Sequence, residues 1–113
     1  DKLQAGVNNQ AALPIQDAEI SMEDEQVRLI KIGDRKVRLS PKLFDVFLYL
    51  FRNSGQVCMR DALLQEALGG KYDASYLPTL IGRIRNMIGD DSENPRYLIT
   101  EQNAGYRLFL KPQ

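Results

Sequence analysis

The sequence predicts an α+β domain built from an N-terminal antiparallel sheet, three helices and a C-terminal β-hairpin. Three observations carry this prediction. Apolar and polar residues alternate on both sides of Gly33-Asp34, as they do in two strands joined by a tight turn. Three segments with apolar residues at three- and four-residue spacing then follow. Two short strand-like runs, residues 96–100 and 105–109, close the chain.

The length and composition fit one domain. A chain of 113 residues with 43% hydrophobic residues can bury a single core. Residues 1–14 show no clear period and are expected to form a linker or disordered terminus, so residues 15–113 would be the folded domain. The chain begins with Asp1 rather than methionine, which indicates a piece of a longer protein. It contains no apolar run of membrane-spanning length.

The residue types present argue against an enzyme. The chain has no histidine, which removes the commonest general acid/base and the commonest metal ligand. Gly69-Gly70 lacks the Lys-Ser/Thr of a phosphate-binding loop, and the run Asp90–Glu93 is expected to be a solvated surface turn. We therefore expect no catalytic site, cofactor, metal or small-molecule substrate. Cys58 is the only cysteine, so no internal disulfide can form and a reducing, cytoplasmic setting is expected.

The first half of the chain predicts three strands and a buried helix. Strands are expected at 18–22, at 27–32 and at 36–39, with Glu23-Asp24-Glu25 and Gly33-Asp34 as turns. Ser40 is a suitable N-cap and Pro41 suits the first helical position, while Asn53-Ser54-Gly55 would end the helix. Its wide apolar arc comprises Leu43, Phe44, Phe47, Leu48, Leu50 and Phe51.

Two more helices are expected before the hairpin. After a short extended piece, Val57-Cys58, the second runs from about Arg60 to Leu68 and begins at a poor cap, Met59. The third begins near Ser75, a good N-cap, and ends at Gly89. Its expected buried stripe is Leu77, Ile81, Ile84 and Ile88. Its expected solvent side is Thr79, Gly82, Arg83 and Asn86, with Arg85 at the flank.

Five segments between residues 37 and 108 resemble a known family. Residues 37–44, 53–64, 81–85, 97–100 and 105–108 are similar to the OmpR/PhoB-type winged-helix DNA-binding domain, and the resemblance covers about Ala18 to Leu110. That domain is the output domain of many bacterial response regulators in two-component systems. The resemblance implies a winged helix-turn-helix in which the helix from Ser75 is the recognition helix and Glu101–Ala104 is the tip of the wing.

The resemblance also implies which residues meet DNA, and where this chain departs from the pattern. Residues matching Thr79, Arg83 and Arg85 commonly lie at or near DNA in the family, and an arginine of the wing commonly enters the minor groove. Here Ser75 stands where arginine is common and Pro78 where an acid is usual. The wing arginine is replaced by Gln102, beside Glu101. These departures concern the affinity and mode of DNA binding rather than the fold.

The charge pattern points to a local positive site. Fifteen basic and fifteen acidic residues give a net charge of zero, which counts mildly against strong non-specific binding to DNA. Between Ser75 and Ile88, however, there are two arginines and no acid. Arginine can bind phosphates and base edges through its bidentate fork.

The candidate DNA contacts lie on the third helix and the wing. They are Ser75, Tyr76, Thr79, Arg83, Arg85, Asn86, Gln102 and Arg107. Lys71 and Tyr72 form a candidate contact loop for DNA or RNA polymerase. Structural alternatives stay open for some of them. Arg83 and Arg85 could lie on a solvated helix face or pair within the domain with Asp61 or Asp73, and the flank position of Arg85 favours such pairing. Arg107 could pair on the sheet, and Tyr106 is expected in the core.

Two functions from different classes follow. The first is a sequence-specific DNA-binding domain of a bacterial transcriptional regulator, acting as a dimer or in tandem on double-stranded DNA, because one neutral domain makes few phosphate contacts. The second is a winged-helix module that binds protein, which the neutral charge, Glu101 and the replaced wing arginine favour. A receiver domain, another sensor or a membrane anchor could precede Asp1.

Overall fold

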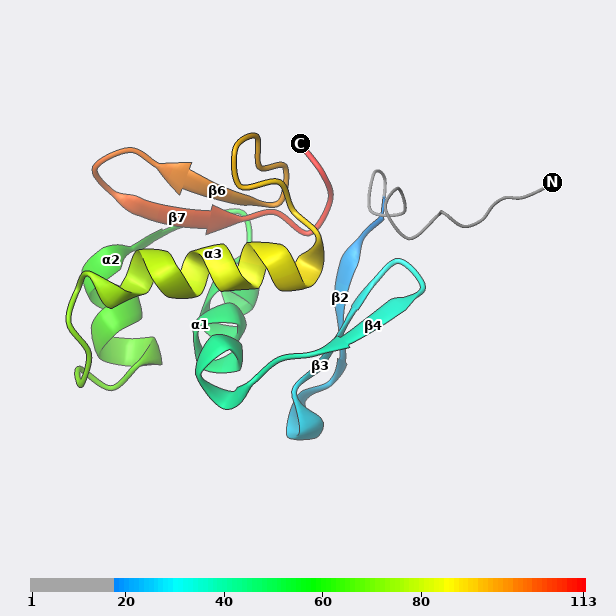
Figure 1. Cartoon of the computed structure of the whole chain (residues 1–113), viewed down its shortest axis with the longest axis horizontal. Helices are drawn as coiled ribbons and strands as arrows, with labels where there is room; N and C mark the ends of the chain where they lie inside the picture. Colours follow the sequence, from blue (N-terminus) through cyan, green and yellow to red (C-terminus); the bar gives the residue numbers. More distant parts are fainter. Residues whose placement is uncertain (1–17) are drawn as a thin grey trace, which may run out of the picture.

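The computed structural model describes residues 18–113 (Figure 1). The expected linker at 1–14 lies outside the described residues, so the domain boundary near residue 15 stays a prediction. The first sheet has the strand order β2-β3-β4 and is antiparallel throughout, with β2 at Ile20–Asp24, β3 at Leu29–Ile32 and β4 at Arg35–Arg38. The Gly33-Asp34 turn is confirmed, and Gly33 adopts a φ of 61° there.

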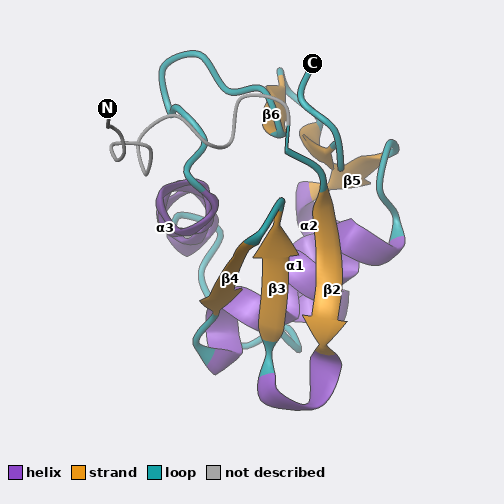
Figure 2. Ribbon diagram, turned by 90° about the vertical axis from the view of Figure 1, so that its right-hand side faces the viewer, coloured by secondary structure: helices purple, strands orange, loops and turns teal. Residues whose placement is uncertain are grey.

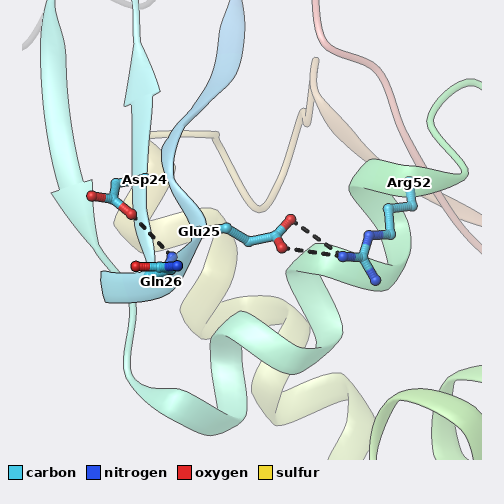
Figure 3. Close-up of polar contacts among 4 residues, drawn as sticks. All are labelled: Asp24, Glu25, Gln26 and Arg52. Carbon is cyan, nitrogen blue, oxygen red and sulfur yellow. Dashed lines mark hydrogen bonds and ion pairs between the residues drawn. The ribbon is translucent and has the colours of Figure 1, made fainter.

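A single helical turn and an ion pair tie the first sheet to α1. The connection from β2 to β3 is a 3-10 turn, η2, at Glu25–Val27, in which Asp24 accepts a hydrogen bond from the Gln26 N–H at 3.0 Å. Glu25, the first residue of η2, pairs with Arg52, the last residue of α1, at 3.2 Å (Figure 3). Both partners are well exposed, so this pair adds little to stability.

Helix α1 spans Pro41–Arg52 and lies behind the first sheet (Figure 2). Its predicted buried face is largely confirmed. Leu43, Phe44, Phe47 and Leu50 are buried together with Val46, while Leu48 and Phe51 are partly buried. Ser40 precedes the helix in an extended conformation, but its side chain makes no capping bond.

The second helix is less regular than expected. It begins as α2, Arg60–Ala62, and continues as a π-helical turn, η3, at Leu63–Ala67, where the Leu68 N–H donates to the Leu63 carbonyl. Met59 indeed offers no capping side chain. A tertiary contact compensates in part, because the Arg60 N–H donates to the carbonyl of Ala104 in the wing turn at 3.3 Å.

Helix α3 spans Tyr76–Ile88, packs against α1 and runs beside the hairpin (Figure 1). The predicted stripe is confirmed, and Leu80 is buried with it. Ser75 does not act as the predicted cap. It is already in a right-handed helical conformation, and its hydroxyl and N–H both donate to the Asp73 carboxylate. These hydrogen bonds from Ser75 lower the pKa of Asp73.

A second sheet forms the wing and joins it to the core. Its order is β5-β7-β6, with β5 at Val57–Met59, β6 at Leu98–Glu101 and β7 at Gly105–Leu108. The short extended piece at Val57 is thus a paired strand rather than a bare connection. Gly105 permits this pairing, since a Cβ there would lie 2.0 Å from the Cys58 carbonyl oxygen. Tyr106 is buried, as expected.

The prediction of a solvated turn at Asp90–Glu93 is wrong for Asp90. Its side chain is 7% exposed and accepts three backbone N–H bonds, from Arg96, Tyr97 and Leu98, at 2.8–3.1 Å. These bonds fasten the end of α3 to the start of β6. Asp91 and Glu93 are exposed, as expected.

Residues 18–113 contain neither a membrane-spanning helix nor a cluster of metal-binding side chains. No helix among residues 18–113 is long and apolar enough to cross a lipid bilayer. The same residues contain no group of three or more acidic or cysteine side chains that could hold a metal ion.

Candidate nucleic-acid interface

The outward face of α3 carries several of the candidate contacts. Thr79, Arg83 and Asn86 are exposed, as is Ser75 just before the helix. Gly82 lies among them, and a Cβ at this position would meet nothing within 4 Å. This face is therefore polar, low in profile at its centre and open to a partner.

Arg83 and Arg85 differ in how their side chains are used. Arg83 is exposed and has no hydrogen bond or ion pair with any residue in 18–113; neither Asp61 nor Asp73 pairs with it. Its guanidinium is free to bind an external anion or base edge.

Arg85 is turned back onto the domain. It donates from Nε and Nη2 to the Leu98 carbonyl at 2.9 and 2.8 Å, and from Nη2 to the Thr100 hydroxyl at 2.9 Å. Burial lowers the pKa of this guanidinium, and the charge of Asp90 acts in the opposite direction. The intramolecular alternative for Arg85 is the one the structure shows, although its partners are on β6 rather than the acids considered from the sequence.

The wing carries its charge as an internal pair. Arg107 Nε lies 2.9 Å from a carboxylate oxygen of Glu101, although the N–H direction does not give a hydrogen bond. The Arg107 guanidinium also lies 5.7 Å from the centre of the Phe109 ring. Gln102 and Asn103 are exposed at the tip, and Asn103 adopts the left-handed φ of 61° that its turn requires. The wing thus offers amides rather than a free cation at its tip.

A cluster of two tyrosines and a lysine lies where α3 begins. The rings of Tyr72 and Tyr76 stack with centres 5.5 Å apart. Lys42, from α1, places its Nζ 4.6 Å from the centre of the Tyr72 ring and donates to the Tyr76 hydroxyl at 3.4 Å. The hydrogen bond to Tyr76 is the main reason that the pKa of Lys42 is raised.

Lys42 is a residue that sequence reasoning missed. It is the second residue of a helix whose pattern predicts only core packing, and it is far from α3 along the chain. No local signal marks it, since only the packing of α1 against α3 brings it to the interface.

The loop before α3 is exposed, as its candidate role requires. Lys71 and Tyr72 line an open groove of about 430 Å³ together with Lys42, Asp45 and Glu66. Cations and acids are mixed in this groove, so it lacks the single sign of charge that a phosphate site would need.

Comparison with known proteins identifies the family. Residues 34–108 match the family described as "Transcriptional regulatory protein, C terminal". The chain belongs to this family. It is thus an OmpR/PhoB-type winged-helix domain. This family consists of transcription factor domains and not of enzymes. The predicted fold class is confirmed.

The curated relatives of this transcriptional-regulator domain are longer proteins. The sensory transduction protein RegX3 of Mycolicibacterium smegmatis is 33% identical over 87 residues, which cover 75% of this chain and 38% of the relative. RegX3 of Mycobacterium tuberculosis matches to the same extent. The chain therefore spans little more than a third of the length of these relatives.

Solved structures agree with the fold. The RstA DNA-binding domain of Klebsiella pneumoniae, crystallised with the RstA box, superposes with a TM-score of 0.69 at 32% identity, covering 76% of this chain and 87% of that one. The Thermotoga maritima response regulator DrrB gives 0.65 at 31% identity over 72% of this chain and 37% of its own. The DNA-binding domain of Escherichia coli CadC, at 21% identity and 0.66, covers 84% of this chain and 94% of that chain and supports the fold alone.

Proposed function

We propose that this transcriptional-regulator domain binds double-stranded DNA sequence-specifically, with α3 in the major groove and the β6–β7 wing beside it. The observation that carries the proposal is Arg83, an exposed guanidinium without a partner in the described chain, on a helix face that has no acid. The relative crystallised with the RstA box supports the assignment by its fold and its 32% identity.

The candidate residues divide into contacts and supports. Thr79, Arg83 and Asn86 would face base edges or phosphates from α3. Tyr76 would meet phosphate at the start of the helix, and Gln102 would meet sugar or phosphate at the wing. Ser75 already donates its N–H and its hydroxyl to Asp73, so we assign it a supporting role at the start of α3. Arg85 and Arg107 have intramolecular partners, so we assign them the role of positioning the wing.

The wider setting of the domain is part of the same proposal. A neutral domain makes few phosphate contacts, so we expect binding as a dimer or as tandem copies. We place the parent protein in the cytoplasm as a response regulator, with a receiver domain in the part that this chain does not span. Lys71 and Tyr72 stay candidates for contact with RNA polymerase.

The test begins with selection of bound sequences from a random duplex pool by the 113-residue chain. On the selected site, Arg83→Ala should weaken binding by about 1–3 kcal/mol, roughly 5- to 150-fold. Arg52→Gln is the control, because Arg52 already pairs with Glu25 at the far end of α1. Equal affinities of wild type and Arg83→Ala on the selected site would remove Arg83 from the interface.

One observation favours a second candidate, a module that binds protein. The wing has no free cation at its tip, because Gln102 is neutral and Arg107 is paired with Glu101. A salt titration separates the two functions, since DNA binding requires the logarithm of affinity to fall steeply with the logarithm of salt concentration. A folded chain that selects no duplex at low salt would support the second candidate.

A further inference from the structure

A second cationic side chain, the half-buried Lys42, lies beside α3 at the start of α1. Lys42 does not extend freely into solvent. Its Nζ lies 4.6 Å from the centre of the Tyr72 ring and 5.1 Å from that of Tyr76, and it donates to the Tyr76 hydroxyl. Cation–π contacts and this hydrogen bond hold the ammonium group over the first turn of α3.

This ammonium group borders a hollow whose charged lining residues are all positive. The hollow measures about 360 Å³ and lies between the start of α1 and one flank of α3. Its lining consists of Ser40, Pro41, Lys42, Leu43, Tyr76, Leu80 and Arg83. Lys42 and Arg83 are its two charged residues, and no carboxylate lines it, in contrast to the neighbouring groove with Asp45 and Glu66.

The hollow has a defined place relative to the proposed DNA-reading face. Tyr76 and Arg83 are seven residues apart, so they share one flank of α3, the flank that faces the start of α1. Arg85 lies on the opposite flank and contacts β6. The exposed residues Thr79 and Asn86 lie between these flanks. The face is thus bordered by the wing on one side and by Lys42 and Arg83 on the other.

We propose that the hollow bounded by Lys42, Tyr76 and Arg83 binds a backbone phosphate of the DNA strand that lines the major groove on the side away from the wing. This inference rests on the proposed function and adds a contact outside α3 and the wing. Lysine suits the role, because its compact charge binds phosphate without demanding one geometry. The two tyrosine rings restrict the lysine beforehand, which reduces the entropy lost on binding.

The experiment measures salt dependence on two duplexes, the selected site and a mixed-sequence duplex of equal length. Lys42→Gln should weaken binding to both by the same factor, because a phosphate contact carries no sequence information. It should reduce the slope of log affinity against log salt by about 0.9. The advantage of wild type over the variant should then shrink about threefold to fourfold between 50 and 200 mM salt. Lys42→Arg should restore the slope.

Arg52→Gln is the matched control, since it removes one positive charge from the same helix ten residues away, roughly 15 Å along its axis. It should leave the slope unchanged. Lys42→Met serves as a second neutral variant if Lys42→Gln lowers the unfolding temperature.

The outcomes separate the two proposals. If Lys42→Gln and Lys42→Met keep the wild-type slope while Arg83→Ala weakens binding, the phosphate site is wrong and the proposed function stands. A Lys42→Gln effect confined to the selected site would also overturn it. Absence of wild-type binding to both duplexes would overturn both proposals.

Discussion

The guanidinium of Arg85 on α3 donates two hydrogen bonds to the carbonyl oxygen of Leu98 on β6, at 2.9 and 2.8 Å. One side chain thus fixes the distance between the proposed recognition helix and the first strand of the wing. Its neighbour Arg83, two residues earlier, has no such partner in the described chain. The two arginines should therefore respond differently to mutation.

Arg85→Ala should lower the free energy of unfolding by about 1.5–3 kcal/mol, the usual contribution of hydrogen bonds to a charged group. Arg83→Ala should change it by less than about 0.5 kcal/mol, because its side chain is exposed. Urea denaturation followed by circular dichroism measures both values. Equal stabilities of the two variants would contradict a supporting role for Arg85.

Asp90→Ala should destabilise the domain by about 3 kcal/mol or more. The substitution removes the acceptor of three N–H groups, two of them in buried bonds, and each unsatisfied group costs about 1–3 kcal/mol. Glu93→Gln, in the same acidic run but exposed, is the control and should be nearly neutral. Hydrogen exchange at Tyr97 and Leu98 should accelerate in the first variant only.

Gly82→Ala should have opposite effects on folding and on DNA binding. The free energy of unfolding should rise by about 0.5–1 kcal/mol, because alanine favours a helix and nothing obstructs its Cβ. Affinity for a selected duplex should fall, because the added Cβ would stand where the proposed DNA approaches the backbone of α3. A variant that gains stability and keeps its affinity would show that the closest approach lies elsewhere on α3.

Gly105→Ala should be strongly destabilising, in contrast to Gly82→Ala. Its Cβ would lie 2.0 Å from the Cys58 carbonyl oxygen, so strands β5 and β7 would have to separate. We expect a loss of about 1–3 kcal/mol or more, the cost of forcing atoms into a filled space. Thermal unfolding of the two alanine variants side by side checks the difference in sign.

Cys58 should be unreactive in the native protein at mildly alkaline pH. Burial raises the pKa of its thiol, so the folded chain keeps this proton where an unfolded chain loses it. The thiol thus contributes stability below its unfolded pKa, and this contribution is lost as the pH rises further. Labelling with a thiol reagent at pH 8 should be slow without denaturant and fast in urea.

Local patterns were sufficient for much of the fold. The Gly33-Asp34 turn, the buried face of α1 and the Leu77–Ile88 stripe each depend on residues close together in the sequence, so periodicity and turn chemistry predicted them. The pattern overlooked Leu80 only because the stripe is wider than one row of side chains.

The features that were missed depend on contacts between distant segments. The burial of Asp90 requires β6 to donate its N–H groups, and the partner of Arg85 is a backbone carbonyl, which no residue type reveals. Lys42 reaches Tyr76 only because α1 packs beside α3. An acidic run or a lone lysine has no local signature for such roles, so sequence reasoning assigned them to solvent or left them out.

The central place of β7 in the second sheet has a consequence for how the domain would meet a partner. Because β7 is paired with β6 on one side and with β5 on the other, the wing is joined to the strand that leads directly into α2. Because its strand β7 is paired on both sides, the hairpin is preorganised, and little conformational entropy is lost when it binds a partner. A wing with little charge can therefore still contribute to affinity, because ordering it on binding costs little entropy.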